Sequence, residues 1–142
     1  MNPLAPGLTR VEADELSYGL HILIRTDLEI ALLEQGLEVA DLPAEWNRCY
    51  GELLGVTPAN DAEGCLQDVH WYDGAWGYFP SYTLGAMTAA QLFAAACESD
   101  KNIPLGIAKG DFKPLIDWLA ENVHSKGRLV SSSDLLNTVT GQ

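Results

Sequence analysis

The sequence has few basic residues, and those it has are not gathered in one place. Among 142 residues, 8 are lysine or arginine and 20 are aspartate or glutamate, which gives a formal net charge of −12. Because the cations are scattered along the chain, they form no basic patch that could attract a polyanion. We therefore expect neither nucleic acid nor an anionic membrane surface as a partner.

Cysteine is also scarce. Cys49, Cys65 and Cys97 form no CxxC pair and have no histidine at metal-ligand spacing, so neither a disulfide framework nor a structural zinc site is indicated. We expect reduced, mostly buried thiols in a cytoplasmic protein. The residues before the first expected helix lack a basic segment followed by an apolar one, so we expect no signal peptide. Because charges interrupt every apolar stretch, we also expect no membrane-spanning segment.

What the sequence does contain is enough apolar material for a core. With 47% hydrophobic residues in 142, the whole chain (1–142) is predicted to form a single helical domain. Apolar residues recur with a period close to 3.6, and capping signals separate the periodic segments. These patterns predict an all-α fold of about five helices packed as an irregular bundle.

The expected first helix begins at a capping box, Thr9 to Glu12, and runs to about Glu34. Its polar face includes His21 and Arg25. The predicted buried positions, which share one face, are Leu16, Leu20, Leu23, Ile24, Ile30 and Ala31.

Four more helices are expected. The second starts at Asp41, with Pro43 in its first turn, and ends at Gly55. The third, from Tyr82 to about Cys97, is rich in small residues and is therefore expected to be central. Asp111 opens the fourth, and a second capping box at residues 131–134 opens the fifth. The predicted buried residues of the second and fourth helices are Trp46, Tyr50, Leu53, Leu54, Phe112, Leu115, Ile116, Leu119 and Val123.

One long segment does not fit a helix. Residues 64–82 read GCLQDVHWYDGAWGYFPSY and hold two of the four tryptophans and three of the five tyrosines. Glycines and a proline interrupt the run. We predict one long aromatic-rich loop, with at most a short strand pair around residues 69–79.

Individual residues suggest chemistry, but each also has an ordinary structural explanation. His70 lies two residues from Asp68, and a carboxylate can orient an imidazole that acts as a proton donor or oxyanion stabiliser. The alternative is a histidine satisfied by hydrogen bonds within the loop. Arg10 and Asp14 lie one turn apart on the expected helix, so an ordinary surface ion pair is the favoured interpretation. Catalysis by a cysteine with a distant histidine stays open.

Four blocks together resemble a known family. Residues 10–14 match the motif R-x-x-A-D, and residues 64–71 match G-x-x-Q-D-x-H-W at every fixed position. Residues 77–82 are similar to G-Y-F-P-[ST]-Y, and the DLPAEWN block at 41–47 also fits. These blocks resemble the C-terminal part of the carboxypeptidase Taq family of zinc metallocarboxypeptidases.

The resemblance implies a fold and a set of roles. The fold would be that of the C-terminal part of a zincin-like carboxypeptidase, with the loop facing the zinc. Arg10 would bind the C-terminal carboxylate of a peptide, with Gln67 and Asp68 also on the substrate side. His70 and Tyr82 would be catalytic, contacting the scissile region or the tetrahedral intermediate. The residues implied as structural support are Asp14, Trp71 and Tyr78.

The family's HExxH helix and its downstream glutamate have no counterpart in this sequence. We therefore assign no metal ligand and no cofactor to the chain, although the full-length family binds zinc. The favoured hypothesis is a truncated, non-catalytic homologue that keeps the substrate-facing wall of the cleft and forms a homo-oligomer. One alternative is an active metallocarboxypeptidase formed with a partner chain that carries the zinc site. Another is a gene fragment without a function of its own.

Overall fold

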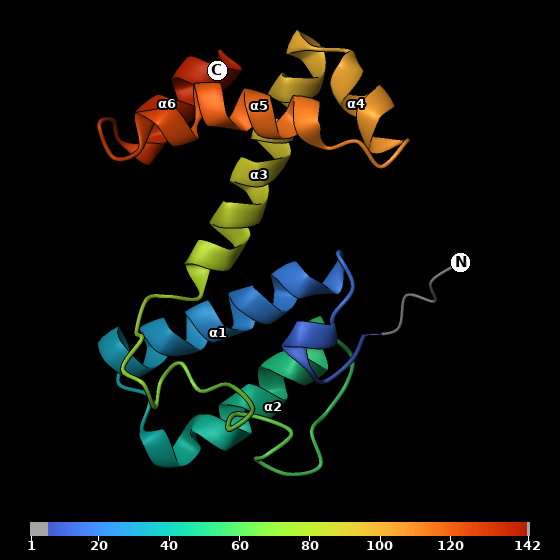
Figure 1. The fold of residues 1–142 in the computed structure, drawn as a ribbon. Coiled ribbons are helices and arrows are strands. Elements are labelled where there is room, and N and C mark those ends of the chain that lie inside the picture. Colours follow the sequence, from blue (N-terminus) through green and yellow to red (C-terminus); the bar gives the residue numbers. More distant parts are fainter. Residues whose placement is uncertain (1–5, 142) are drawn as a thin grey trace. The chain divides into compact units, whose positions relative to one another are not determined.

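The computed structural model describes residues 6–141, and within them it contains helices and no strand (Figure 1). The all-α prediction is confirmed, whereas the strand pair suggested around residues 69–79 does not form. Six α-helices are described in place of about five. Their bounds are α1 (Ser17–Glu34), α2 (Leu42–Leu53), α3 (Pro80–Ser99), α4 (Asn102–Ile107), α5 (Lys113–Asn122) and α6 (Ser132–Thr140). Three short 3₁₀ helices are η1 (Arg10–Glu12), η2 (Val39–Asp41) and η3 (His124–Lys126).

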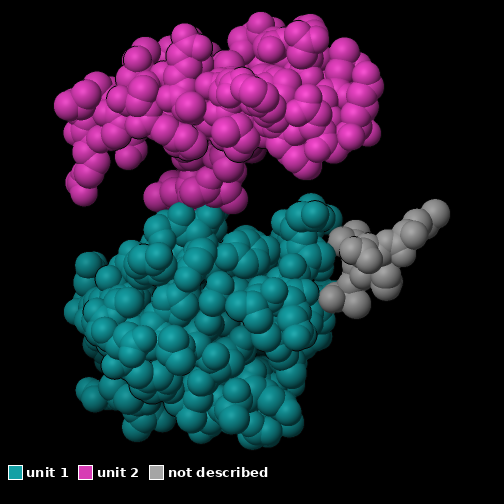
Figure 2. Space-filling view, viewed as in Figure 1, with its two compact units in different colours: residues 1–83 teal, residues 84–142 magenta. Residues whose placement is uncertain are grey.

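The chain divides into two compact units, residues 1–83 and residues 84–142 (Figure 2). The first unit contains α1, α2 and the long loop, together with the first turn of α3. The second contains the rest of α3 and helices α4 to α6. The single domain expected from chain length remains a prediction.

The core of the first unit lies between α1 and α2. Trp46 and Tyr50 of α2 stack with their ring centroids 5.0 Å apart, and both are almost fully buried. Leu54 is also buried, as predicted, but Leu53 is 42% exposed. Pro43 lies in the first turn and Gly55, with φ of +70°, follows the end of the helix, both as expected. Asp41 makes no side-chain cap, contrary to the prediction.

Helix α1 starts later than predicted. Thr9 makes no capping hydrogen bond, and the chain forms only the 3₁₀ turn η1 there. Asp14 instead caps α1, because its Oδ1 accepts the backbone N–H groups of Leu16 and Ser17, each at 2.9 Å. These hydrogen bonds hold the pKa of Asp14 below its usual value, and the one from the Ser17 backbone N–H has the largest effect.

The buried face of α1 also differs from the predicted one. Three leucine or isoleucine positions expected in the core, Leu16, Leu23 and Ile30, are 72%, 46% and 39% exposed. The residues that α1 buries are Ser17, His21, Ile22, Ile24, Arg25, Leu28 and Glu29. Several polar side chains of α1 therefore point into the core. Burying them would cost free energy without hydrogen-bond partners, and the long loop supplies those partners.

The second unit has a small core. Among its described residues only Ala96 and Ile103 are buried, while Leu84, Met87 and Phe93 of α3 are exposed. The expectation that α3 would be central is therefore wrong for this structure. No helix within residues 6–141 is long and apolar enough to cross a membrane.

The predicted start of the last helix is confirmed. Ser131 Oγ accepts the backbone N–H of Asp134, and Gly141 ends α6 in the left-handed region. Asp111 Oδ1 accepts the backbone N–H of Lys113 at the start of α5, as the sequence indicates. Phe112 is 56% exposed, however, against its predicted burial.

Candidate functional site

Asp68 is the centre of the polar cluster in the first unit. Arg10 donates to its Oδ1 from Nε (3.2 Å) and Nη2 (2.8 Å), and Arg25 donates from Nε to its Oδ2 (2.5 Å). Burial disfavours the carboxylate, but the hydrogen bonds and charges of Arg10 and Arg25 outweigh it, and the pKa of Asp68 is below its usual value. The carboxylate therefore stays ionised and fixes both guanidinium groups.

Arg10 pairs with Asp68 and not with Asp14, which corrects the surface pair favoured from spacing. Arg10 is only 7% exposed. The guanidinium carbon lies 4.9 Å from the ring centroid of Tyr82 and 5.9 Å from that of Phe79. Arg10 is thus brought together with Asp68 and Tyr82, although it is 58 residues from the first of them in the sequence.

Gln67 connects the long loop to the segment before α1. Its Oε1 accepts from Arg25 Nη2 (3.1 Å) and from the backbone N–H of Arg10 (3.4 Å). Its Nε2 donates to the carbonyl oxygens of Leu8 (3.1 Å) and Glu63 (2.9 Å). These contacts hold the loop in place; a role of Gln67 toward a substrate stays a prediction.

His70 and Tyr82 form a hydrogen-bonded pair. His70 Nε2 lies 2.9 Å from the Tyr82 hydroxyl, and the imidazole packs 4.4 Å, centroid to centroid, from Phe79. His70 Nδ1 is buried and has no hydrogen-bond partner within residues 6–141. It lies 3.9 Å from Asp68 Oδ1, which is beyond hydrogen-bond length, so Asp68 contacts the two arginines and not the imidazole.

Of the three residues implied as structural support, Tyr78 lies directly beside this pair, Trp71 packs near it against Phe79, and Asp14 lies elsewhere. Trp71 stacks on Trp76 with centroids 5.7 Å apart and donates its indole N–H to Glu29 Oε1 at 2.9 Å. Tyr78 lies edge-on to Tyr82 at 5.4 Å. Asp14 lies at the cap of α1 and contacts Ser17.

The sequence interpretation missed three inward-facing residues of α1. His21, Arg25 and Glu29 are all less than 4% exposed and follow one another at four-residue spacing. That spacing places them on one helix face, which is the signal that could have found them. The predicted pattern places His21 and Arg25 on the polar face opposite the expected core and does not single out Glu29.

His21 is held in its neutral form. Its Nδ1 lies 3.1 Å from the Tyr50 hydroxyl, and its Nε2 is buried without a partner within residues 6–141. Burial, together with the charges of Arg25 and Arg10, lowers the pKa of His21 to about 4. A neutral imidazole beside two guanidinium groups avoids adding a third buried positive charge.

The side chains present do not fit a zinc site. Within the part of the chain that the structure describes, no group of three or more histidine, cysteine, aspartate or glutamate side chains is placed to hold a metal ion. The site carboxylates contact arginines or N–H groups instead. Cys49 and Cys65 are buried, and burial raises the pKa of each thiol, which does not favour a cysteine nucleophile.

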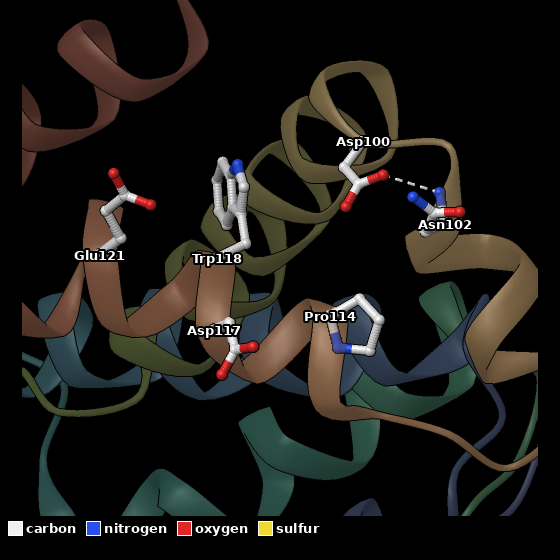
Figure 3. Close-up of a pocket in the computed structure, with 6 residues that line it drawn as sticks. All are labelled: Asp100, Asn102, Pro114, Asp117, Trp118 and Glu121. Atoms are coloured by element: carbon white, nitrogen blue, oxygen red, sulfur yellow. Dashed lines mark hydrogen bonds between the residues drawn. The ribbon is translucent and has the colours of Figure 1, made fainter.

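The second unit holds a separate acidic surface pocket of about 470 Å³. Figure 3 shows Asp117 pointing away from Trp118 and Glu121, while the Asp100 carboxylate accepts the backbone N–H of Asn102. None of the residues singled out in the sequence lines this pocket, so it is not part of the candidate site.

A family model described as "Carboxypeptidase Taq (M32) metallopeptidase" matches residues 1–142. The chain belongs to this family. It is 46% identical over 142 residues to Carboxypeptidase 1 of Bacillus subtilis (strain 168) and 43% identical to Thermostable carboxypeptidase 1 of Thermus thermophilus. All of this chain is covered in both matches, but only 28% of the length of each of these relatives.

The solved structures agree with this assignment. An M32 carboxypeptidase from Deinococcus radiodurans R1 matches with a TM-score of 0.91 and 40% identity, covering 98% of this chain and 28% of that one. Trypanosoma cruzi metallocarboxypeptidase 1 matches with a TM-score of 0.90 and 39% identity, over 98% of this chain and 29% of that one. The chain is therefore similar to somewhat more than a quarter of a metallocarboxypeptidase.

Proposed function

We propose that the first unit forms the substrate-facing wall of a metallocarboxypeptidase cleft and that the chain does not hydrolyse peptides by itself. The observation that carries this proposal is the pair His70–Tyr82, joined at 2.9 Å and set against the Arg10 guanidinium. The absence of a fitting set of metal ligands within residues 6–141 supports the non-catalytic part.

The pair is suited to stabilise an oxyanion. When His70 Nε2–H donates to the tyrosine oxygen, the phenolic hydrogen of Tyr82 is free to donate to the negative oxygen of a tetrahedral intermediate. Donors that are already oriented stabilise such an oxygen without reorganising during the reaction. Arg10 would bind the terminal carboxylate of the peptide through Nη1, because Asp68 occupies its Nε and Nη2.

The first experiment uses the chain alone, with an N-blocked dipeptide as substrate and Zn²⁺ added. We expect no release of the C-terminal amino acid and no stoichiometric zinc after dialysis. Metal-dependent release by the purified chain would overturn the proposal that it is non-catalytic.

The second experiment places the chain within a full-length relative. In Carboxypeptidase 1 of Bacillus subtilis, the matching segment is replaced by residues 1–142 of this chain. We expect activity, a fall in kcat of about 10²- to 10³-fold for His70→Ala or Tyr82→Phe, and a higher KM for Arg10→Lys. The matched control is Val69→Ala, because Val69 is 63% exposed beside His70. An active chimera whose kcat is unchanged by His70→Ala would refute the catalytic role.

A partner chain offers the second candidate function. Mixing this chain with the remaining portion of the Bacillus relative would produce zinc-dependent peptidase activity if the two assemble. Activity in the mixture, and in neither component, would favour a complemented enzyme over a purely non-catalytic protein.

We also propose that the chain forms a homo-oligomer. Leu16 and Leu53, which are 72% and 42% exposed, line the same surface pocket of the first unit, and contiguous exposed apolar surface favours association. Sedimentation that finds only monomer at high concentration would contradict this. We further propose a cytoplasmic location, which the free thiols support because a reducing compartment keeps cysteines unpaired.

A further inference from the structure

Glu29 is a buried carboxylate that the proposed function has not used. It is 3% exposed, and none of the ion pairs among residues 6–141 involves it. Burying a carboxylate without a cation costs free energy unless hydrogen bonds compensate. Oε1 of Glu29 accepts two of them, from the Trp71 indole N–H (2.9 Å) and from the backbone N–H of Gly77 (3.0 Å).

The two donors belong to a tight turn that begins at His70 and to the residues just after it: Trp71 is the second residue of the turn, and Gly77 lies two residues beyond its end at Ala75. Trp71 directly follows His70, and Gly77 comes six residues later, with φ of +73°. Within the turn, the backbone N–H of Ala75 donates to the His70 carbonyl at 2.8 Å. One oxygen atom of Glu29 therefore closes the turn from outside, while the backbone closes it from within.

Two successive turns of α1 hold the chain on both sides of His70. Arg25 contacts Asp68, two residues before the histidine, and Glu29 contacts Trp71, one residue after it. The backbone of His70 is thus fixed from α1, although the imidazole makes no hydrogen bond to that helix.

The Gly77 contact fixes the other half of the pair. Phe79, which packs on the imidazole at 4.4 Å, and Tyr82, which hydrogen-bonds it at 2.9 Å, follow Gly77 by two and five residues. Releasing Gly77 would free the segment that leads to both contacts. Glu29 therefore restrains His70 and its partner at the same time.

We propose that Glu29 is a positioning residue for His70, setting the distance between the imidazole and the Tyr82 hydroxyl by holding Trp71 and Gly77 to one carboxylate oxygen. The effect of Glu29 on the position of the His70 imidazole can be tested in this chain alone and does not depend on the proposed function. Its consequence for turnover rests on the proposed function.

The first test measures position without activity. The variants are Glu29→Leu, which removes the acceptor, and Glu29→Gln, which keeps an oxygen there. Glu34→Leu is the matched control on an exposed position of the same helix. In ¹⁵N NMR of the purified chain, we expect Glu29→Leu to shift the ring resonances of His70 and to speed hydrogen exchange of the Trp71 indole about tenfold or more. Glu29→Gln should restore most of both signals, and Glu34→Leu should change neither.

The proposal is overturned if Glu29→Leu speeds exchange at Trp71 and Gly77 while the ring resonances of His70 stay as in the unaltered chain. Glu29 would then only stabilise the loop. If Glu29→Leu does not fold, Trp71→Phe removes one donor and leaves the carboxylate. We expect it to shift the His70 resonances in the same direction by a smaller amount, and unchanged resonances would again overturn the proposal.

The second test uses the chimera described above. We expect Glu29→Leu to lower kcat by about 10- to 100-fold with little change in KM, and Glu29→Gln to recover most of the loss. A full kcat in Glu29→Leu would overturn the positioning role. A chimera that is inactive with the unaltered insert would count against the proposed function alone, because the NMR result decides the role of Glu29 independently.

Discussion

His21 shows how a single buried group can set the pH dependence of the fold. It is fully buried, and Arg25, Arg10 and Asp68 are the charged groups that act on it. The pKa of His21 is about 4 in the folded chain, below the ordinary value of 6.5 for an exposed histidine. Between these two pH values the unfolded chain binds a proton that the folded chain does not, so acid favours unfolding.

We therefore predict that the free energy of unfolding falls by about 2 kcal/mol when the pH is lowered from 7 to 5. Urea unfolding at the two pH values measures this difference. In His21→Asn, which keeps a polar atom near the Tyr50 hydroxyl, most of the difference should disappear. His124→Asn, at an exposed position, should retain it. Equal pH dependence in His21→Asn and the unaltered chain would show that another group is responsible.

The candidate site could be anticipated only in part at the level of residues. The loop motif placed Gln67, Asp68 and His70 in one short segment, and their neighbourhood follows from the chain itself. The four-residue spacing of Arg25 and Glu29 shows that they share a helix face but not that this face is buried, because polar residues on a helix are normally exposed. Their burial depends on partners more than 40 residues away, which no local pattern contains.

At the scale of elements, α1 shows how two competing caps are resolved. Thr9 and Glu12 have the spacing of a capping box, yet Asp14 makes the cap hydrogen bonds. Arg10 explains the outcome: its side chain contacts Asp68, and its backbone N–H contacts Gln67 in the long loop. The prediction from sequence used only the Thr9–Glu12 signal, and a tertiary contact overrides it.

Two substitutions test this choice. Asp14→Ala should lower the free energy of unfolding by about 1 kcal/mol, because two backbone N–H groups lose their acceptor. Thr9→Ala should change it by less than about 0.5 kcal/mol, as expected of a surface position without such a contact. Urea unfolding at pH 7 measures both, and a larger effect at Thr9 than at Asp14 would contradict the structure.

Two glycines are predicted to respond oppositely to alanine. A Cβ atom on Gly106 of α4 would lie 2.6 Å from the backbone oxygen of Asp111, which cannot move aside without shifting the start of α5. Gly106→Ala should therefore cost about 1–3 kcal/mol. A Cβ on Gly85 of α3 meets nothing within 4 Å, so Gly85→Ala should stabilise by about 1 kcal/mol. Thermal unfolding distinguishes the two, and a stabilising Gly106→Ala would contradict the close approach.

Helix α4 was missed for a related reason. It has only six residues and contains both a glycine and a proline, which are ordinarily read as breaks. The longer helices, α2 and α6, were anticipated because apolar spacing and end signals agreed there. Such agreement is not sufficient by itself, because α1 also combines a periodic pattern with a capping box and still starts later than predicted.

At the scale of the whole chain, the two units differ in how much they bury. The first has a core cluster of eight buried residues, whereas the second buries only Ala96 and Ile103 among its described residues. Unfolding free energy depends mainly on buried apolar area. Chain length and composition indicated a sufficient core but not its uneven distribution.

We predict that the second unit unfolds at a lower urea concentration than the first. Trp118 reports on the second unit, since the other three tryptophans precede residue 84. Subtracting the fluorescence of Trp118→Phe from that of the unaltered chain isolates its transition, which should precede the transition of the remaining tryptophans. Coincident transitions would show that the chain unfolds as one cooperative body.

The buried thiols of the first unit have a practical consequence. Cys49 and Cys65 are 8% and 4% exposed, and their raised pKa values leave little thiolate near neutral pH. An alkylating reagent can modify them only after the surrounding helices separate. The rate at which these two sulfur atoms are labelled therefore measures how often the structure around α2 and the aromatic loop opens spontaneously, without any introduced probe.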